Sequence, residues 1–204
     1  MKILAAADIH GAQYRLNLIL ENIERYHPDL VIICGDITQF GPGDVAKNFL
    51  NQLPGETLAI PGNIDTADVP QAIKESKATY LHMKKHDAHG LSFIGVSGVN
   101  PGDIELFFTD EEKKTWITKD TILVSHVPPK GYQDRVFFGM HSGSEELRRV
   151  VDAYHPQLVL CGHIHEDPGI TKTDDTIIIN CSMGKRGSGA LIIMGTPLRA
   201  EMLD

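Results

Sequence analysis

Short apolar runs and amphipathic stretches alternate along most of the chain. Five apolar runs have the length of buried strands: residues 2–7, 29–34, 57–60, 121–125 and 158–161. Residues 13–26 place Leu16, Ile19 and Ile23 on one face at helical spacing, which predicts an amphipathic helix. Periodicity and capping residues predict further helices at residues 44–53, 70–77, 110–118 and 144–154. Such alternation is typical of α/β proteins.

The remaining segments have the pattern of antiparallel β-structure. Residues 79–86 and 92–97 flank a polar turn at 87–90, which predicts a hairpin. Further strands are predicted at residues 169–173, 176–181, 190–195 and 198–203. This order predicts a mixed α/β fold with more than one sheet. No shift in composition divides the chain, so we expect one domain over residues 1–204.

The composition is that of an ordinary globular protein, with 42% hydrophobic and 23% charged residues. The net charge of −8 disfavours an extended nucleic-acid surface, because most of the molecule would repel a phosphate polymer. No apolar run approaches the roughly 18 residues that span a bilayer, and the stretch before Asp8 is too short for a signal-peptide core. Three scattered cysteines fit a reducing compartment. We therefore expect a cytoplasmic protein with no membrane partner, and homo-oligomerisation stays open.

Polar residues that carry chemistry follow five of the predicted strands. The groups at these strand ends are Asp8-Ile9-His10, Gly35-Asp36, Gly62-Asn63-Ile64-Asp65, His126 and Gly162-His163-Ile164-His165. Ligands of open α/β sheets bind beyond the carboxyl ends of the strands, so the five groups converge if their strands share a sheet. One D-x-H motif carries little information, since about one is expected by chance. Five such groups at five strand ends are a specific signal.

The seven candidate ligands in these groups are two carboxylates, one carboxamide and four imidazoles. This set favours a borderline divalent ion, with Mn²⁺ as the first choice and Fe²⁺, Ni²⁺, Co²⁺ or Zn²⁺ as alternatives. The mixture of nitrogen and oxygen argues against a Ca²⁺ or Mg²⁺ cage. Seven ligands are too many for one tetrahedral zinc ion and suit two ions that share a carboxylate. Two such ions favour an anionic substrate, and a phosphate ester is the expected partner.

The order D-x-H, G-D, G-N-x-D, H and G-H-x-H resembles that of the calcineurin-like metallophosphoesterases, over residues 8–165. This resemblance implies an α/β fold in which two mixed β-sheets pack as a sandwich flanked by helices. It implies one metal ion held by Asp8, His10, Asp36 and His165. It implies a second ion held by Asp36, Asn63, His126 and His163, with Asp36 bridging the two. The residues expected to have catalytic roles are His10, Asp36, Asn63 and His126.

One position departs from the family pattern. Many members have a histidine where this chain has Ile64, and that histidine is thought to protonate the leaving group or to bind phosphate. Isoleucine transfers no proton, and loss of a general acid typically lowers a rate roughly 10²–10⁴-fold. We therefore expect a dinuclear-metal phosphoesterase in which a metal-bridging hydroxide attacks phosphorus. Phosphodiesters are the preferred substrates and phosphomonoesters the second choice.

Three residues outside the motifs are candidates for substrate contacts. His141 and Arg135 lie in the long loop after His126, and Arg186 lies in a glycine-rich loop. The loop that contains His141 precedes a predicted helix, whose N-terminus can bind an anion. We hypothesise that His141 partly replaces the missing acid.

Alternative interpretations remain for one residue and for the function as a whole. Asp65 would orient the missing histidine in related motifs, and its alternative role is to cap the next helix. A binding scaffold that keeps the fold without turnover is the alternative to an enzyme, and Ile64 favours it while the complete ligand set opposes it. A metal-dependent hydrolase of a non-phosphate ester or amide is the third class.

Overall fold

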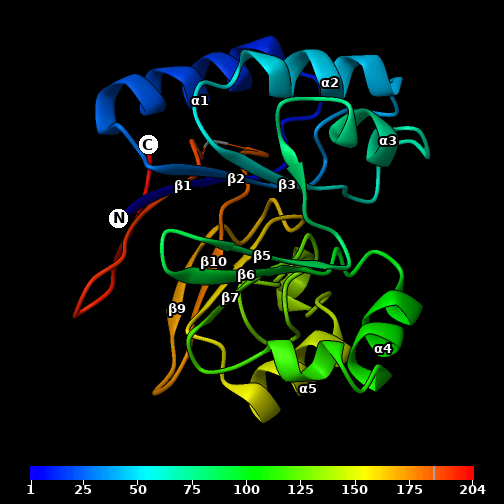
Figure 1. Cartoon of the computed structure of the whole chain (residues 1–204), viewed down its shortest axis with the longest axis vertical. Coiled ribbons are helices and arrows are strands. Elements are labelled where there is room, and N and C mark those ends of the chain that lie inside the picture. Colours follow the sequence, from blue (N-terminus) through cyan, green and yellow to red (C-terminus); the bar gives the residue numbers. More distant parts are fainter. Residues whose placement is uncertain (186) are drawn as a thin grey trace.

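The computed structural model describes residues 1–185 and 187–204. The helices are α1 (Gln13–Tyr26), α2 (Gly43–Gln52), α3 (Val69–Lys74), α4 (Pro101–Thr109) and α5 (Glu145–Tyr154), with 3₁₀ turns at Lys113–Trp116 and Phe137–Gly139. The first sheet has the order β12 (Arg199–Met202), β11 (Ala190–Ile193), β1 (Lys2–Ala6), β2 (Leu30–Cys34), β3 (Thr57–Ile60) and β4 (Thr79–Tyr80). The second has the order β5 (Lys84–Ala88), β6 (Leu91–Gly95), β7 (Thr121–Val124), β8 (Leu158–Cys161), β10 (Ile177–Asn180) and β9 (Gly169–Lys172). Figure 1 shows the two sheets stacked between two layers of helices.

The central strands of both sheets are parallel. In the first sheet β1, β2, β3 and β4 run in one direction, and β11 is antiparallel to β1. In the second sheet β6, β7, β8 and β10 are parallel, and β5 and β9 close the two edges as antiparallel strands. The sheets touch where Ala7, just after β1, bridges in parallel to Ser182, just after β10. The loops at the carboxyl ends of both sheets therefore meet at one side of the molecule, which we call the metal edge.

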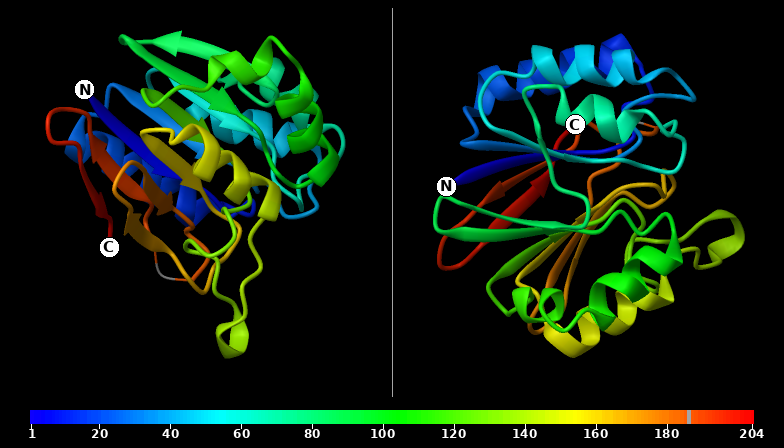
Figure 2. Two further views of the ribbon diagram at one scale, coloured as in Figure 1. Left: turned by 90° about the horizontal axis from the view of Figure 1, so that it is seen from below. Right: turned by 45° about the vertical axis from the view of Figure 1, so that its right-hand side comes forward.

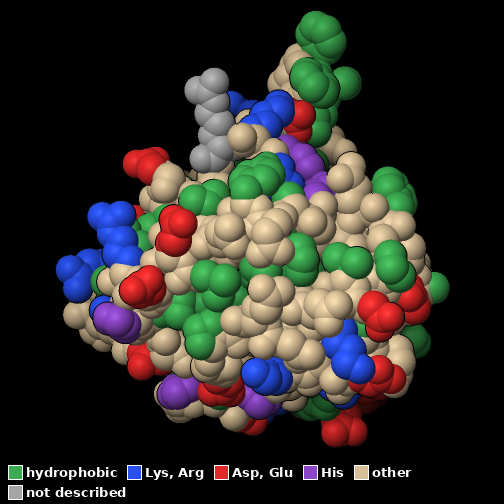
Figure 3. All heavy atoms as spheres, turned by 90° about the horizontal axis from the view of Figure 1, so that it is seen from above, with side chains coloured by type: hydrophobic (Ala, Val, Ile, Leu, Met, Phe, Trp, Pro, Cys, Tyr) green, Lys and Arg blue, Asp and Glu red, His purple; other side chains and the backbone are tan. Residues whose placement is uncertain are grey.

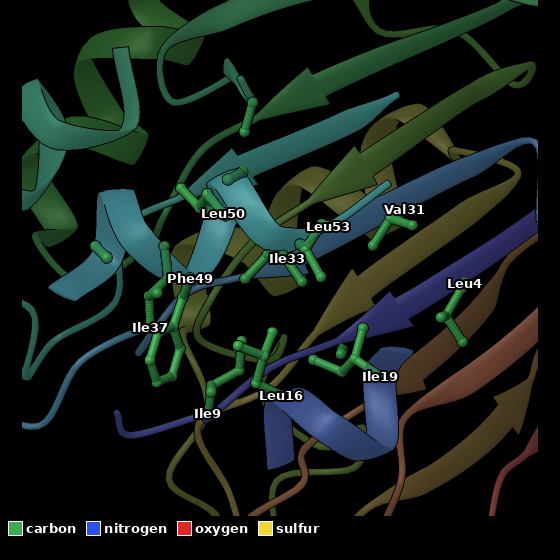
Figure 4. Packing of buried hydrophobic residues seen from close by; sticks show 14 of the residues in the cluster. Leu4, Ile9, Leu16, Ile19, Val31, Ile33, Ile37, Phe49, Leu50 and Leu53 are labelled. Carbon is green, nitrogen blue, oxygen red and sulfur yellow. The ribbon is translucent and has the colours of Figure 1, made fainter. Parts of the chain in front are cut away.

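The strands are apolar on both faces because each sheet packs against helices and against the other sheet. In β1, Ile3 and Ala5 belong to the core between the sheets. Leu4 belongs to the core beneath α1 and α2, where Leu16 and Phe49 also lie. Figure 4 shows this outer packing at close range. A third cluster holds α4 and α5 against the outer face of the second sheet.

The observed architecture confirms the α/β fold of two mixed sheets flanked by helices that the family resemblance implied. The five apolar runs all form strands, and the helix predicted at 144–154 begins where Ser144 accepts a hydrogen bond from the Leu147 amide, 3.1 Å away. Among the described residues, none of the helices combines the length and apolar character needed to cross a bilayer.

The helix predicted at residues 110–118 is wrong. The α-helix in this region is α4, and only a 3₁₀ turn follows it. Asn100 caps α4 by accepting a hydrogen bond from the Gly102 amide at 3.0 Å, and Pro101 occupies the first helical turn. Asp110 has an extended backbone that ends α4, and its carboxylate accepts hydrogen bonds from the amides of Glu112 and Lys113, so it caps a 3₁₀ turn rather than the predicted α-helix.

The strand predicted at residues 79–86 is divided between the two sheets. Thr79–Tyr80 pairs with β3, whereas Lys84–Ala88 pairs with β6 as the hairpin strand. Leu81 between them is fully buried among the residues of the inter-sheet core. The chain crosses from one sheet to the other at this point, and a period-two pattern cannot show such a crossing.

Candidate metal centre

The structure brings all seven predicted ligands to the metal edge. Donor atoms of Asp8, His10 and His165 lie within 4.8 Å of one another, which makes a first triad. Donor atoms of Asp36, His126 and His163 make a second triad with the same limit. Asn63 joins the second triad through its amide oxygen, as described below. The strands that carry these residues are β1, β2, β3, β7 and β8.

The first triad is built around the fully buried carboxylate of Asp8. His165 Nε2 lies 3.4 Å and His10 Nε2 lies 3.7 Å from Asp8 Oδ1. Burial alone would raise the pKa of Asp8, but the two histidines outweigh it and hold that pKa well below its usual range. His10 Nε2 is buried and has no hydrogen-bond partner among the described residues. A buried nitrogen without a partner is costly unless another group occupies its lone pair, and a metal ion is such a group.

In the second triad, ring nitrogens of His126 and His163 both approach the amide oxygen of Asn63. Asn63 Oδ1 lies 2.8 Å from His126 Nε2 and 2.8 Å from His163 Nδ1. Asp36 Oδ2 lies 3.4 Å from His126 Nε2 and also 3.9 Å from His10 Nε2 in the first triad. The Asp36 carboxylate therefore lies between the two triads, which is the position that a bridging ligand would occupy.

The ring of His126 is oriented by the backbone. Its Nδ1 donates a hydrogen bond to the Cys34 carbonyl oxygen at 2.8 Å, because a carbonyl can only accept. Nε2 then faces Asp36 and is available as a ligand atom, the arrangement that metal-binding histidines commonly use. Burial by itself lowers the pKa of His126, but the Asp36 carboxylate outweighs burial and raises it to about 9. An ion that binds Nε2 must displace this proton.

Four of the seven residues have a left-handed backbone, with positive φ values: Asp8 (62°), His10 (55°), Asp36 (52°) and His163 (68°). Non-glycine residues rarely adopt this conformation, and each costs free energy that the surrounding structure must supply. The backbone is also unusually close here. A Cβ atom on Gly35 would lie 2.6 Å from His126 Nδ1 and 2.9 Å from the Gly62 backbone. Strain and close approach concentrated at one cluster are typical of a functional site.

Asp65 has neither of the roles considered for it. Its carboxylate accepts hydrogen bonds from the amides of Ile37 (3.1 Å), Thr38 (2.8 Å) and Gly62 (2.9 Å). It therefore ties the loop after β2 to the loop after β3, and the helix cap position of α3 belongs to Asp68. Only the tertiary structure reveals this role, because Ile37 and Thr38 lie 28 and 27 residues away from Asp65 in sequence.

The donor set fits divalent metal ions. Within the described part of the chain, no lysine or arginine side chain pairs with either buried carboxylate, Asp8 or Asp36. Buried carboxylates without a cation partner are unfavourable, and a metal ion supplies the missing charge. The orphaned His10 nitrogen and the convergent donors around Asn63 point to the same kind of ligand.

The candidate substrate contacts lie outside the two triads. His141 Nδ1 binds the buried carboxylate of Asp134 at 2.6 Å, and the ring lines a depression that Lys130 and Arg148 also line. The exposed Arg135 is anchored through its backbone amide, which donates to Asp167 Oδ2 at 3.0 Å. Arg186 lies outside the described residues. Contact of these residues with a substrate stays a prediction.

Comparisons with known proteins identify related chains. The family model described as calcineurin-like phosphoesterase matches residues 1–167. An uncharacterized protein of Methanocaldococcus jannaschii is 30% identical over 197 residues, which cover 89% of this chain and 88% of that protein. A probable glycerophosphodiester phosphodiesterase of Arcobacter nitrofigilis is 28% identical over 176 residues, covering 78% of this chain and 64% of the relative. A dimetal phosphatase structure from Danio rerio has a TM-score of 0.65 at 12% identity, covering 95% and 92% of the two chains, and shares the fold.

Proposed function

Because this chain belongs to the calcineurin-like phosphoesterase family, we propose that it is a dinuclear-metal phosphoesterase that hydrolyses phosphodiesters in preference to phosphomonoesters. The observation that carries the proposal is the pair of adjacent ligand triads with the Asp36 carboxylate between them. The family membership supports the class of reaction, and the geometry supports the assignment of the residues proposed to perform it.

The proposed ligand sets follow the two triads. Asp8, His10, Asp36 and His165 hold one ion, and Asp36, Asn63, His126 and His163 hold the other. The bound ions supply an activated water for attack on phosphorus and neutralise charge on the phosphoryl oxygens. Manganese is the first choice, and iron, nickel, cobalt and zinc have overlapping ligand preferences.

The surrounding residues keep this arrangement rigid. Cys34 orients the ring of His126, and the Ile64 amide donates to Asp36 Oδ1 at 3.0 Å. The His163 amide donates to Asp8 Oδ2 at 3.0 Å, so one candidate ligand positions another across the two sheets. Ligands held in place before the substrate arrives need little reorganisation during the reaction.

The preference for diesters rests on Ile64. Its amide is part of the site, but its side chain carries no proton that could reach a leaving group. A leaving group that is stable without protonation is therefore favoured. The name of the Arcobacter relative, a probable glycerophosphodiester phosphodiesterase, supports the same preference.

The experiment that tests the proposal pairs metal content with turnover. The protein is stripped with a chelator, reloaded with Mn²⁺, Fe²⁺, Ni²⁺, Co²⁺ or Zn²⁺, and assayed with bis-p-nitrophenyl phosphate and p-nitrophenyl phosphate. Two ions per chain and metal-dependent cleavage of the diester in excess of the monoester are expected. Two bound ions without turnover of any ester would favour the scaffold, and failure to bind ions would overturn the proposed centre.

The substitution Ile64→His tests the explanation of the diester preference. A histidine at this position restores a proton donor beside Asp36, so we expect phosphomonoesterase activity to rise about 10-fold or more. Ile64→Gln is the matched control, because it adds a polar side chain without a titratable proton. Equal monoesterase rates in Ile64→His and Ile64→Gln would contradict the explanation.

A further inference from the structure

The strongly exposed aromatic side chains of this protein all lie at the metal edge. Four rings are more than half exposed: Tyr14 (61%), Phe40 (73%), Phe137 (67%) and Phe138 (101%). Every other Phe, Tyr and Trp in the chain is buried or half-buried. Aromatic rings carry a large apolar surface that is normally buried, so their collection at one edge calls for an explanation.

Two of these rings follow candidate metal ligands closely in sequence. Tyr14 lies in the first turn of α1, four residues after His10. Phe40 lies four residues after Asp36, and its amide donates to the Ile64 carbonyl oxygen at 3.1 Å. Phe40 is thus joined directly to the residue that replaces the proton donor of other family members.

The other two rings stand on the loop of residues 130–143, which projects from the body of the molecule (Figure 2, left). This loop is fastened beside the first triad. Phe137 faces Lys185 Nζ, 5.5 Å from the ring centre, and Lys185 pairs at 3.1 Å with Glu166, the residue after His165. Hydrophobic side chains stand out at the top of Figure 3, next to lysine, arginine and histidine side chains.

The tip of this loop is held in a costly conformation. Phe138 has a φ of 61°, in the left-handed region that large side chains rarely adopt, and it is fully exposed. Both the strain and the exposure disfavour this arrangement unless the ring has a binding partner. The four aromatic residues, which we call the aromatic rim, come from the segments that follow β1, β2 and β7, three of the strands whose ends carry candidate ligands. These segments border the side of the molecule on which a phosphate held by the triads would present its ester groups.

We propose that the aromatic rim binds a planar aromatic group on the substrate, so that the substrate is a phosphodiester with an aromatic non-leaving group. This inference rests on the proposed function and adds the chemical class of one ester group. Rings prefer to stack on other rings, which distinguishes an aromatic group from a short alkyl group. The net charge of −8 disfavours an anionic bilayer as the occupant.

The test compares two diesters that release the same leaving group. Phenyl p-nitrophenyl phosphate and methyl p-nitrophenyl phosphate both lose p-nitrophenolate. Each kcat/KM is divided by the rate of uncatalysed hydrolysis of the same ester, because phenoxy withdraws more electron density than methoxy, and the remaining difference reports contacts with the other ester group. We expect the metal-loaded protein to prefer the phenyl ester at least 10-fold. Phe40→Leu, Phe137→Leu and Phe138→Leu keep an apolar side chain but remove the ring. At least two of them should reduce the preference, by about 2- to 10-fold each.

Leu106→Ala is the matched control, since Leu106 is 62% exposed on α4 and belongs to neither the rim nor the triads. It should leave both rates unchanged. Calorimetric titration with diphenyl phosphate and dimethyl phosphate measures the same preference without turnover, and tighter binding of diphenyl phosphate is expected.

The possible failures are distinguishable. Hydrolysis of both esters at equal kcat/KM, or a phenyl preference that no rim variant changes, overturns the aromatic rim and leaves the phosphodiesterase intact. Hydrolysis of neither ester by protein with two bound ions overturns both proposals. If the rim variants lose binding to lipid vesicles without any change in ester preference, the rim would be assigned to a membrane. If they dissociate a dimer without such a change, it would be assigned to a second copy of the chain. Either result would show that the proposal is wrong.

Discussion

Histidine and carboxylate side chains gather at both ends of the central strands, but in different surroundings. At the carboxyl ends, Asp8 and His126 are fully buried and face other donor atoms, and no lysine or arginine among residues 1–185 and 187–204 pairs with Asp8. At the opposite ends, Glu56 precedes β3 and accepts hydrogen bonds from His86 (3.1 Å) and His89 (3.0 Å) of the β5–β6 hairpin. These three side chains are between 29% and 40% exposed.

The comparison teaches that residue type alone does not identify a metal centre. Both groups join one sheet to the other, and both combine imidazole with carboxylate. Water screens the charges of the Glu56 group and completes its hydrogen bonds, so the group needs no metal ion. Within the part of the chain that the structure describes, the buried triads leave His10 Nε2 without a hydrogen-bond partner and two carboxylates without a lysine or arginine partner. Burial and missing partners, rather than composition, distinguish a site that needs an ion.

The largest effect is expected for Asp36→Asn. The Asp36 carboxylate lies between the two triads, and asparagine keeps its shape while removing the charge. We expect phosphodiesterase activity to fall by more than the roughly 100-fold that loss of an outer-shell partner can cost. Metal analysis should find fewer than two ions per chain. Asp174→Asn, in an exposed turn, is the control and should keep both properties; the prediction is wrong if Asp36→Asn keeps them too.

The substitutions Gly35→Ala and Gly55→Ala compare the backbone at the metal edge with the backbone at the opposite ends of the strands. Both glycines have positive φ, 93° and 82°. A Cβ on Gly35 would meet His126 and Gly62, whereas a Cβ on Gly55 meets nothing within 4 Å. Gly55→Ala should cost only backbone strain, about 1 kcal/mol of unfolding free energy. Gly35→Ala should cost about 2–4 kcal/mol, because strain and overpacking add. Urea unfolding of the two variants measures the difference, and equal losses would contradict the close packing at the metal edge.

The response to pH provides a smaller effect with a defined sign. The pKa of His126 without metal is raised to about 9, above the roughly 6.5 of an unfolded histidine. This raised pKa stabilises the metal-free protein fully below pH 6.5, and the contribution disappears as the pH rises through 9. Metal binding must remove the same proton, so ion affinity should increase over this range, by about 10-fold per pH unit for one released proton.

Two measurements check these opposite trends. Thermal unfolding of the metal-free protein from pH 6 to pH 9 should show a falling midpoint, while titration with Mn²⁺ over the same range should show tighter binding. Calorimetry in two buffers with different ionisation enthalpies counts the protons released at pH 7. An ion affinity that does not change with pH would show that His126 is not a ligand.

The sequence predicts the site well because each group of candidate ligands directly follows a predicted strand. Apolar runs identified the five strands, and the carboxyl ends of parallel strands meet at one edge. The rule alone does not bring Asp8 and His165 together, because β1 and β8 belong to different sheets and the five strands do not share one sheet as the argument from sequence required. The 3.4 Å distance between their side chains depends on the stacking of the two sheets with their carboxyl ends on the same side. The rule says nothing of backbone conformation, so the left-handed backbone of Asp8 and Asp36 was not predicted.

Features that depend on tertiary contacts were missed. Asp65 bonds to amides after β2, which no local pattern indicates. The predicted elements do not include α4, although Asn100 followed by Pro101 is a helix-start signal. An exposed Phe138 looks in sequence like a core phenylalanine, since only the fold decides which aromatic rings are buried.

The smallest effect is expected for Glu56→Gln, at the ends of the strands opposite the metal edge. Burial would raise the pKa of Glu56, but its two histidine partners outweigh burial and lower it. The stabilisation is therefore present above the pKa of an unfolded glutamate and is lost as the pH falls through the lowered value. Because the carboxylate is 38% exposed, solvent screening limits the pair to about 0–1 kcal/mol.

Glu56→Gln should lower the midpoint of thermal unfolding slightly at pH 7, converge with the parent protein at pH 3, and leave ion content and turnover unchanged. A loss of bound ions in this variant would show that the two ends of the strands are coupled through the sheets, and the contrast between a screened ion pair and a metal centre would then have to be abandoned.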